Sequence, residues 1–490
     1  MENENNIELI LKPHERPKSV GKWMVLSLQH VFAMFGATVL VPMVINQNAG
    51  TEVINISMAL FCSGIGTLIY IALTAAKVPI YLGSSFSYMS ILGIGFSTQA
   101  GGYGWGNAIF IGIFLVGVVY MLVGVLIHFT GVQWIKKTFS PIIVGPIVMI
   151  IGLSAIKSAL SNSGIIYEKS TDPALNYPQY LAIIIAFVTF LSAAICMLKA
   201  KSFFKVIPIL VALMIGYVLT LVLHFSLSGT DIKLVDTSLI TNTKDWSWYP
   251  SFKKIWDVKP SSIGPAALAI VPISIVTMVE HLGDHINIGN MTNKDFVKDP
   301  GISRTLFADG VAMSLAGAIG GPANATYAEN TSVVSITKVA SVWVTGLAAV
   351  MALIMSFVAP INQLILMIPK PVMGGISIML FGMISSNGIK ILIDNKTDFR
   401  DARNLIIISL VVAIGVGMGV TDSVIMIGKS FTITGLFLAT FVGIILNLLL
   451  PKHDNLGVFS WIGSIQNRKE NNEKKPKIEK SKKESEKVKK

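Results

Sequence analysis

Apolar stretches of roughly twenty residues recur along the whole chain, and this recurrence restricts the fold more than any other feature. A helix of that length spans the roughly 30 Å hydrocarbon core of a bilayer. We place the stretches at 24–45, 55–76, 78–96, 106–129, 138–159, 179–198, 203–226, 262–283, 304–321, 322–337, 340–360, 364–386, 404–420 and 431–450. These fourteen stretches predict an all-α polytopic protein that crosses a membrane fourteen times.

The composition excludes the main alternatives to a membrane protein. Hydrophobic residues make up 52% of the 490 residues and charged residues only 13%, about half the roughly 25% of an ordinary soluble domain. That charge is too sparse to cover a soluble enzyme, a coiled coil or a disordered chain of this length. Cys62 and Cys196 both lie inside apolar stretches, which excludes a disulfide scaffold as well.

Half of the formal net charge of +12 lies in one polar segment at the C-terminus. Between Arg468 and Lys490, eleven lysines and arginines accompany five glutamates, which leaves a net charge of +6. A basic patch interleaved with aromatic residues is not found, so nucleic-acid binding is not expected. We interpret residues 451–490 as a solvated cytoplasmic tail.

Lysine and arginine also indicate the orientation in the membrane. They precede the first apolar stretch and recur at every second connection, whereas the short connections 46–54 and 97–105 carry none. Loops rich in these residues stay in the cytoplasm. We therefore expect both termini to be cytoplasmic, with residues 1–23 as the N-terminal segment.

The longest polar connection, residues 227–261, divides the apolar stretches into two sets of seven. It contains Trp246, Trp248 and Tyr249, which is typical of a membrane interface. Because seven is odd, the second set runs through the membrane in the opposite direction to the first. The count predicts two inverted repeats, a common construction in secondary transporters.

Two stretches, each the third of its set, lack the composition of a lipid-facing helix. They read VPIYLGSSFSYMS (78–90) and GPANATYAENTSVVSITK (321–338), with Gly, Pro, Ser, Thr and Asn where leucine is expected. Interrupted spans at matching positions of two repeats indicate the binding site of a transporter. Irregular backbone at that depth is tolerated only inside protein or beside a water-filled cavity, so we expect both segments to meet in the interior.

Three carboxylates inside the apolar stretches are the strongest functional candidates, because a charge at the bilayer centre costs about 2.5–3.5 kcal/mol. Glu280 and Asp284 are four residues apart, which places both on one face of a helix. Glu329 lies in the second interrupted segment. Carboxylates that share a cavity repel one another, so we expect at least one to hold a proton, as proton coupling requires. The alternatives are that Glu280 and Asp284 mark a helix end in cytoplasmic water and that Glu329 caps broken backbone.

The same segment raises the alternative of a metal site. Glu280, His281, Asp284 and His285 are all metal-ligand types within six residues. Their order is not that of the HExxH motif, and the two histidines lie roughly 100° around the helix from the two acids. We therefore expect no metal.

Other polar residues favour structural roles. Asp309 lies about one turn inside an apolar stretch and is interpreted as a cytoplasmic helix cap. Gln29 and His30 are expected to form hydrogen bonds to a neighbouring helix. The segment SVIMIGKS, which ends at Ser430, lacks the first glycine of a phosphate-binding loop. The chain therefore carries no ATPase and no expected enzymatic activity, and transport would use an ion gradient or facilitation.

Five segments resemble the nucleobase/ascorbate transporter family, and most closely its bacterial uracil permease branch. The segments are SLQHVFAMFGATVLVP (27–42), YLGSSFSYMS (81–90), VEHLGDH (279–285), KDPGISRTLFADG (298–310) and PANATYAENTSVVSITK (322–338). They occur in the family's order and spacing, and the resemblance covers roughly residues 18–450.

The resemblance implies fourteen spans in two inverted repeats of seven, with a short β-strand in each of spans 3 and 10. It implies a core domain of spans 1–4 and 8–11 and a gate domain of spans 5–7 and 12–14, with the substrate between them. The expected boundaries are 24–129 and 262–360 for the core domain, 138–226 and 361–450 for the gate domain, and 227–261 for the extracellular loop.

The resemblance also assigns roles to individual residues. It implies that Glu280 and Glu329 hydrogen-bond a nucleobase and that Phe86 contacts the ring. Asp284, together with Glu280, is implied to carry the coupled proton. The other positions expected to line or support the site are Ser85, Ala37, Ala328, Tyr327, Gln29, His30 and Asn330.

Three positions depart from the family pattern. Asp284 stands where some uracil permeases have histidine, which leaves the proton carrier open. Ser332 and Ala328 stand where the motif has glycine, and their side chains would narrow the site or shift its backbone.

The implied function is import of uracil by proton symport across a bacterial plasma membrane, with alternating access and no cofactor. Uracil is a flat ring whose two N–H groups suit carboxylates and whose two carbonyls suit backbone amides. Such a site is selective, because a wrong ring leaves buried polar groups unpaired. The alternatives are a xanthine or other purine permease on the same fold, an anion transporter of similar architecture, and Na⁺ as the coupling ion. The resemblance further implies a homodimer through the gate domain.

Overall fold

The computed structural model describes most of the chain. The described residues are 9–97, 103–131, 140–166, 177–201, 204, 207–227, 229–236, 246–421, 423–427 and 431–451. The expected cytoplasmic tail therefore lies outside the described residues, apart from its first position.

The elements follow the expected apolar stretches. Before the long connection they are α1 (Val20–Ala49), α2 (Ile56–Leu73), β1 (Leu82–Ser84), η1 (Phe86–Tyr88), α3 (Met89–Phe96), α4 (Ala108–Thr130), α6 (Pro141–Asn162), α7 (Gln179–Lys199) and α9 (Pro208–Ser226). After it they are α11 (Pro260–Ile270), η3 (Val271–Ile273), α12 (Ser274–Thr292), η4 (Val297–Gly301), α13 (Ile302–Ile319), β2 (Asn324–Thr326), α14 (Ala328–Thr337), α15 (Val342–Met355), α16 (Ala359–Leu366), α17 (Lys370–Asp394), α18 (Ala402–Val420), β3 (Val424–Ile427), β4 (Phe431–Thr434) and α19 (Gly435–Leu449).

The helices begin where local sequence supplies a start signal. The side chains of Asn55, Asp401 and Thr434 accept hydrogen bonds from the first turns of α2, α18 and α19. Such caps satisfy backbone N–H groups that have no partner inside the helix. Proline occupies the first turn of α6, α9, α11 and α17, where its missing N–H costs no hydrogen bond.

The predicted all-α membrane fold is confirmed, but helix length alone does not give fourteen spans. Among the described residues, ten helices are long and apolar enough to cross a membrane, or eleven if one bent pair counts as a span. The two interrupted segments contain only short helices, α3 and α14, and α19 has 15 residues.

The bent pair corrects two of the expected boundaries. Helices α15 and α16 meet at 83°, and α17 starts only at Lys370. The boundary expected between the stretches 340–360 and 364–386 is therefore wrong, because the chain breaks after Met355 and again before Lys370. Pro360 lies in the first turn of α16 and cannot donate the backbone hydrogen bond that would continue α15 through the break.

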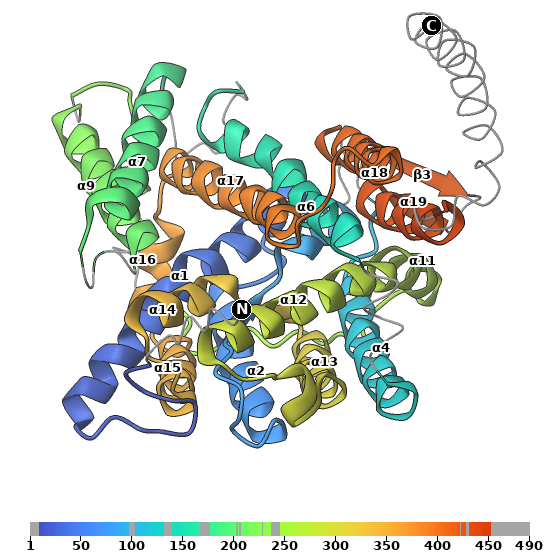
Figure 1. The fold of residues 1–490 in the computed structure, drawn as a ribbon. Coiled ribbons are helices and arrows are strands. Elements are labelled where there is room, and N and C mark those ends of the chain that lie inside the picture. Colours follow the sequence, from blue (N-terminus) through green and yellow to red (C-terminus); the bar gives the residue numbers. More distant parts are fainter. Residues whose placement is uncertain are drawn as a thin grey trace, which may run out of the picture.

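The helices pack in two groups, which Figure 1 shows in its lower and upper halves. In one group α4 packs on α13, α2 on α15 and α1 on α3; in the other α6 packs on α17 and α18, and α7 on α9 and α17. The same contacts occur twice, with the roles of the two halves of the chain exchanged. The pair α4–α13 corresponds to the pair α15–α2, and the pair α6–α18 corresponds to the pair α17–α7. This is the packing expected of the predicted inverted repeats.

The two interrupted segments meet in the middle of the molecule, as predicted. Strands β1 and β2 form an antiparallel pair in which Gly83 faces Ala325. All residues of both strands are buried. The hydroxyls of Ser63 and Thr67, on α2, donate to the Leu82 carbonyl, at 2.7 and 3.2 Å. The strand pair is thus tied to a neighbouring helix through its backbone.

The N-terminal segment before α1 is attached to the turn between α14 and α15. Leu11 forms a parallel bridge with Val339. The backbone N–H of Ala340 donates to the Leu11 carbonyl and that of Val342 to the Pro13 carbonyl, both at 2.9 Å. These bonds fasten the start of the chain to the second interrupted segment, although the two are more than 300 residues apart in sequence.

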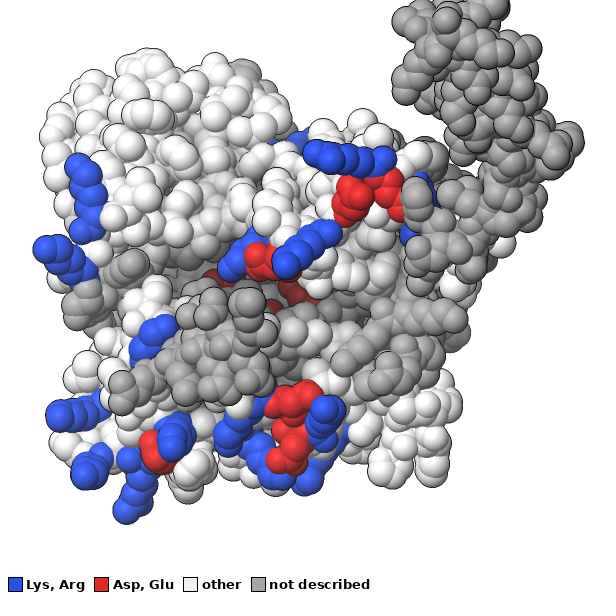
Figure 2. Space-filling model, viewed as in Figure 1, with Lys and Arg blue, Asp and Glu red and all other residues white. Residues whose placement is uncertain are grey.

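Large hydrophobic side chains cover much of the outer surface. Phe129, Leu198 and Leu449 are 80%, 85% and 75% exposed. A soluble protein rarely exposes apolar surface on this scale, whereas a bilayer covers it. On the face shown in Figure 2, charged residues gather on part of the surface and around a central hollow, and acidic atoms lie inside that hollow.

Substituting Gly83 by alanine tests the close approach of the two strands. A Cβ atom there would lie 2.3 Å from the Tyr327 ring, which is itself only 3% exposed. Overpacking of this kind costs about 1–3 kcal/mol, so we expect Gly83→Ala to lower the melting temperature of the purified protein. Gly264→Ala is the matched control, because nothing lies within 4 Å of its Cβ. Equal melting temperatures for the two variants would contradict this account of the strand pair.

Candidate functional site

Two helices begin beside the strand pair. The chain leaves β1 at Ser84 and enters η1 at Phe86, and it leaves β2 at Thr326 and enters α14 at Ala328. The first N–H groups of a helix have no acceptor within it. Both interrupted segments therefore present backbone donors at the centre of the molecule, and an anion or carbonyl oxygen is favoured there by the helix dipole.

Helix α12 carries two carboxylates past these helix starts. Thr326, the last residue of β2, donates its hydroxyl hydrogen bond to Asp284 Oδ2. The carboxylates of Asp284, Glu329 and Asp309 all act electrostatically on Glu280. In the described part of the chain, no protein group donates a hydrogen bond to the Glu280 carboxylate. Its oxygen atoms are thus available to a ligand donor.

Exposure separates the expected site residues into two sets. Glu280, Asp284, Ala328, Glu329 and Phe86 are half-buried, so each retains some accessible surface. The buried set contains Ser85, Ala37, Tyr327, Gln29, His30 and Asn330. The first set lies on α12, η1 and α14 and keeps surface that a ligand can reach, whereas the side chains of the second set are enclosed by protein.

Tyr327 and Ala37 belong to the wall behind the strands. The Tyr327 hydroxyl donates to the Ser84 carbonyl at 2.9 Å and accepts from Thr38 Oγ1 at 3.3 Å. Thr38 directly follows Ala37 on α1, and Ala37 is fully buried. Tyr327 therefore connects α1, β1 and the start of α14, which fixes the position of the site backbone.

The expected interhelical hydrogen bonds on α1 are present at one position and not at the other. The amide of Asn330 lies 3.2 Å from His30 Nδ1 and donates to the His30 carbonyl at 3.2 Å, which confirms that prediction. For Gln29 the predicted hydrogen bond is not formed by Oε1, which is buried without a partner among the described residues. Gln29 lies on a different side of α1 from the His30 contact, and no donor of the described residues reaches it.

Asp309 is not the helix cap that the sequence suggested. It lies in the interior of α13, is 1% exposed and has its Oδ2 2.9 Å from His281 Nδ1. Nε2 of His281 lies 3.1 Å from Thr305 Oγ1, one turn earlier on α13. The sequence position was misleading because η4 precedes α13 and the helix starts at Ile302, seven residues before Asp309.

His285 extends this network away from the carboxylates. Its Nδ1 donates to the His281 carbonyl at 2.6 Å, since a carbonyl can only accept. Nε2 then accepts from the Tyr70 hydroxyl at 2.6 Å, which describes a neutral imidazole. Both histidine rings thus have both nitrogen atoms engaged on the side of α12 that faces α2 and α13. They join α12 to its neighbours and do not converge with Glu280.

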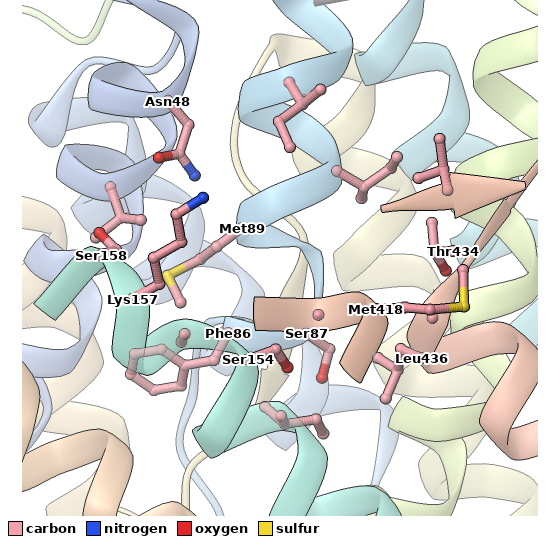
Figure 3. Close-up of a pocket in the computed structure, with 18 of the residues that line it drawn as sticks. Asn48, Phe86, Ser87, Met89, Ser154, Lys157, Ser158, Met418, Thr434 and Leu436 are labelled. Carbon is pink, nitrogen blue, oxygen red and sulfur yellow. The ribbon is translucent and has the colours of Figure 1, made fainter. Parts of the chain in front are cut away.

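A cavity of about 300 Å³ adjoins the site at Phe86 and Ser87. Its other walls come from the ends of α1 and α6, from η3 and α3, and from α18, β3, β4 and the start of α19 (Figure 3). Neither Glu280, Asp284 nor Glu329 lines it. Phe86 therefore has the cavity beside it and packs edge-to-face on Phe381 of α17, with ring centroids 6.1 Å apart.

The chemistry of the site is that of a polar planar ligand. Carboxylate oxygens of α12 and α14 accept hydrogen bonds, backbone N–H groups at two helix starts donate them, and Phe86 offers an aromatic surface. A site of this kind fixes the orientation of a ring by its edges and covers its face. It has no arrangement of nucleophile and base among the described residues on which we could build a catalytic step.

Several functional residues were not found from the sequence. Thr326 was read only as part of an interrupted segment, although its place beside the glutamate-bearing turn was a usable signal. The partners Tyr70 and Thr305 carry no signal, because hydroxyls are common in membrane helices and bond their own backbone. The hydroxyls of Ser84 and Ser87 are buried without partners among the described residues, which a sequence does not reveal.

Comparison with known proteins places the chain in a family. The model of the Permease family matches residues 21–425, which includes every candidate site residue. The chain belongs to the Permease family. The expected resemblance to nucleobase permeases is thereby confirmed at the level of family, and the protein is a polytopic membrane permease.

This permease has curated relatives over nearly its whole length. It is 38% identical to the uracil permease of Bacillus caldolyticus over 446 residues, which is 90% of this chain and 95% of the relative. It is 35% identical to the uracil permease of Escherichia coli strain K12, over 89% and 92% of the two chains. The putative pyrimidine permease RutG of the same strain is 31% identical over 90% and 92%.

Solved structures of other membrane transporters share the permease's fold. The transmembrane domain of a cyanobacterial bicarbonate transporter, BicA, superposes with a TM-score of 0.56 at 12% identity and covers 89% of this chain and 100% of that one. The murine anion transporter Slc26a9, in its inward-facing state, gives a TM-score of 0.58 at 13% identity, over 89% and 69%. At such low identity the likeness concerns the fold alone.

Replacing Asp309 in this permease tests whether the His281 network is structural. Asp309→Ala leaves a buried imidazole N–H without an acceptor, which costs about 1–3 kcal/mol. We expect a lower melting temperature of the purified protein. Asp309→Asn is the matched control, because its amide oxygen still accepts from His281 and the variant should melt closer to wild type. If Asp309→Ala melts like wild type, the network does not hold α12 to α13.

Proposed function

We propose that this permease imports a nucleobase, with uracil as the first candidate. The observation that carries the proposal is the placement of Glu280 and Glu329 beside two helix starts and the Phe86 ring. The names of the curated relatives support the same substrate, since those at 35–38% identity are uracil permeases.

Uracil matches this site edge by edge. Its two N–H groups would donate to the Glu280 and Glu329 carboxylates, and its carbonyl oxygens would accept from backbone N–H groups at the start of η1 or α14. The ring face would lie on Phe86. Each such hydrogen bond to a charged group contributes about 1.5–3 kcal/mol, and a ring lacking the matching group leaves a carboxylate unpaired.

We further propose proton symport. Glu280, Asp284 and Glu329 repel one another in a confined space, so adding a proton to Asp284 or Glu280 relieves repulsion and favours the substrate-bound state. The hydroxyl of Thr326 donates to Asp284, which couples that carboxyl to the strand beside the ring. Loss of the proton inside the cell would restore the repulsion and release the base. Na⁺ is the alternative coupling ion.

Alternating access would follow from movement between two domains. The proposed core domain comprises residues 24–129 and 262–360, and the proposed gate domain comprises 138–226 and 361–450. The substrate contacts named above belong to the core domain, while Phe381 on α17 touches Phe86 from the gate side. The core would move with its substrate against the gate, which would also provide a homodimer interface.

The proposed orientation places both termini in the cytoplasm of a bacterium and the connection 227–261 outside. It rests on the distribution of lysine and arginine among the short loops. In that orientation α1 and α6 end at the outer face, so the cavity beside Phe86 opens toward the outside.

A purine and an anion are the two alternative substrates to compare with uracil. A xanthine or other purine permease would use the same carboxylates for a larger ring. An anion transporter is suggested by the names of the solved structures that share the fold. Three neighbouring carboxylates oppose an anion at this site, so we favour a neutral base.

Uptake into proteoliposomes tests the proposal. Radiolabelled uracil is added with and without an inward proton gradient, and with excess unlabelled xanthine or bicarbonate. We expect uptake that the gradient accelerates and that unlabelled uracil, but not bicarbonate, inhibits. Inhibition by xanthine would extend the substrate range to purines. Uptake at the same rate with and without the proton gradient would contradict the symport mechanism.

Charge-neutral variants test the two glutamates. Glu280→Gln and Glu329→Gln replace one acceptor oxygen with an amide donor, and we expect either change to raise the apparent dissociation constant for uracil by about tenfold or more. Glu52→Gln is the control, because Glu52 is exposed and lies in the connection between α1 and α2, outside both interrupted segments. Wild-type affinity in Glu280→Gln and Glu329→Gln would exclude these residues from the site.

A further inference from the structure

The cavity beside Phe86 contains one charged side chain that the proposed transport mechanism does not use. Among the described residues that line it, Lys157 of α6 is the only lysine, arginine, aspartate or glutamate. It lies five residues before the end of α6, about 7 Å along the helix. A lysine in an apolar span is costly and is typical of a functional position, and Lys157 lines this cavity.

Uncharged amides and hydroxyls surround Lys157 on its side of the cavity. Figure 3 shows Lys157 directed toward Asn48 of α1, with Ser158 near them on the same side of the cavity. Gln47 lines the same wall. The lysine ammonium has three donors and no acceptor, whereas each amide and each hydroxyl can both donate and accept. The positive charge of Lys157 is therefore opposite in sign to the carboxylates deeper in the molecule.

Two hydroxyls that line the cavity have no partner in the described part of the chain. These are Ser87 Oγ, next to Phe86, and Ser158 Oγ, next to Lys157. Buried hydroxyls are normally hydrogen-bonded, so each points to a missing polar partner. The opposite wall is more apolar, with Met418 and Leu436 facing the polar side across the cavity (Figure 3).

We propose that this cavity is a second binding site, which holds a planar heterocycle by its oxo groups before the ring reaches the carboxylates. Lys157 and Asn48 donate to the carbonyl oxygens, and Phe86 and Leu436 cover the ring. A volume of about 300 Å³ is at the lower end of small-molecule sites, which suits one ring. The proposal rests on the proposed nucleobase transport and makes Lys157 a determinant of specificity for oxo-substituted rings.

The second site has a kinetic consequence that separates it from a structural role. Loss of the Lys157 donors weakens capture of the ring, but the reorientation of a bound ring still depends on the carboxylates. We expect Lys157→Gln to raise the KM for uracil about tenfold, since bonds to charged groups are the strong ones, while the maximal rate changes less than twofold. Lys157→Arg keeps the charge and the donors and should stay within about threefold of wild type.

Discrimination between rings gives an independent readout. Cytosine presents an amino donor where uracil has one carbonyl, so it meets the Lys157 ammonium, which can only donate, unfavourably. We expect Lys157→Gln to reduce the preference for uracil over cytosine, measured as the ratio of their inhibition constants, by about fivefold or more. The reason is that glutamine also offers an acceptor. Lys370→Gln is the matched control, since it removes the same charge from an exposed position outside the cavity.

The experiment is initial-rate uptake of labelled uracil into proteoliposomes holding wild type, Lys157→Gln, Lys157→Arg or Lys370→Gln, with cytosine as competitor. A Lys157→Gln protein with the KM and selectivity of wild type overturns the second site and leaves nucleobase transport intact. A reduced maximal rate with unchanged KM also overturns it. If Lys157→Gln does not fold, Asn48→Ala undergoes the same test with the same criteria. A folded wild type that transports neither uracil nor xanthine overturns both the transport proposal and the second site.

Discussion

The antiparallel pairing of β1 with β2 is the interaction on which the rest of the architecture depends. Only three residues from each strand pair, but they join two interrupted segments that lie about 240 residues apart in sequence. Backbone groups inside a membrane protein must find partners, and the two segments satisfy each other. The pairing brings two helix starts to one place, so Phe86 and Glu329 lie beside the carboxylates of α12.

Charge is the second constraint. Three half-buried carboxylates are expensive in an apolar surrounding, and the structure supports them with few direct partners. Thr326 donates to Asp284, and the Glu329 carboxylate accepts from its own backbone N–H. Among the described residues the other acceptor positions stay open to a ligand or a proton. The neighbouring network of Tyr70, His285 and His281 with Asp309 is buried and joined by hydrogen bonds, although Asp309 Oδ1 has no partner among the described residues. It holds α12 in place without consuming Glu280. Helix α12 thus carries both the histidines that fix its position and the carboxylates that keep free acceptor positions.

Much of this arrangement could be predicted from the sequence, because it depends on the local composition of short segments. Gly, Pro and Ser in the interrupted segment of each half predicted that the two segments break and meet, and four-residue spacing placed Glu280 and Asp284 together. Which face of α13 meets α12 is a tertiary property, and so the sequence suggested a cap at Asp309 where the structure has a buried pair. The bend between α15 and α16 was missed for a related reason, since hydropathy continues through a break that backbone geometry imposes. Lys157 carried no local signal, as its cavity is assembled from both halves of the chain.

The most direct test of the central claim is an experimental structure of the permease with uracil bound. The account predicts density for the ring against Phe86, with its N–H groups within hydrogen-bond distance of Glu280 and Glu329 and a carbonyl oxygen facing the first N–H groups of α14 or η1. A ring in the Lys157 cavity would be an addition to that result. Saturating uracil with the space between α12, η1 and α14 empty, or a ring that contacts neither glutamate, would contradict it.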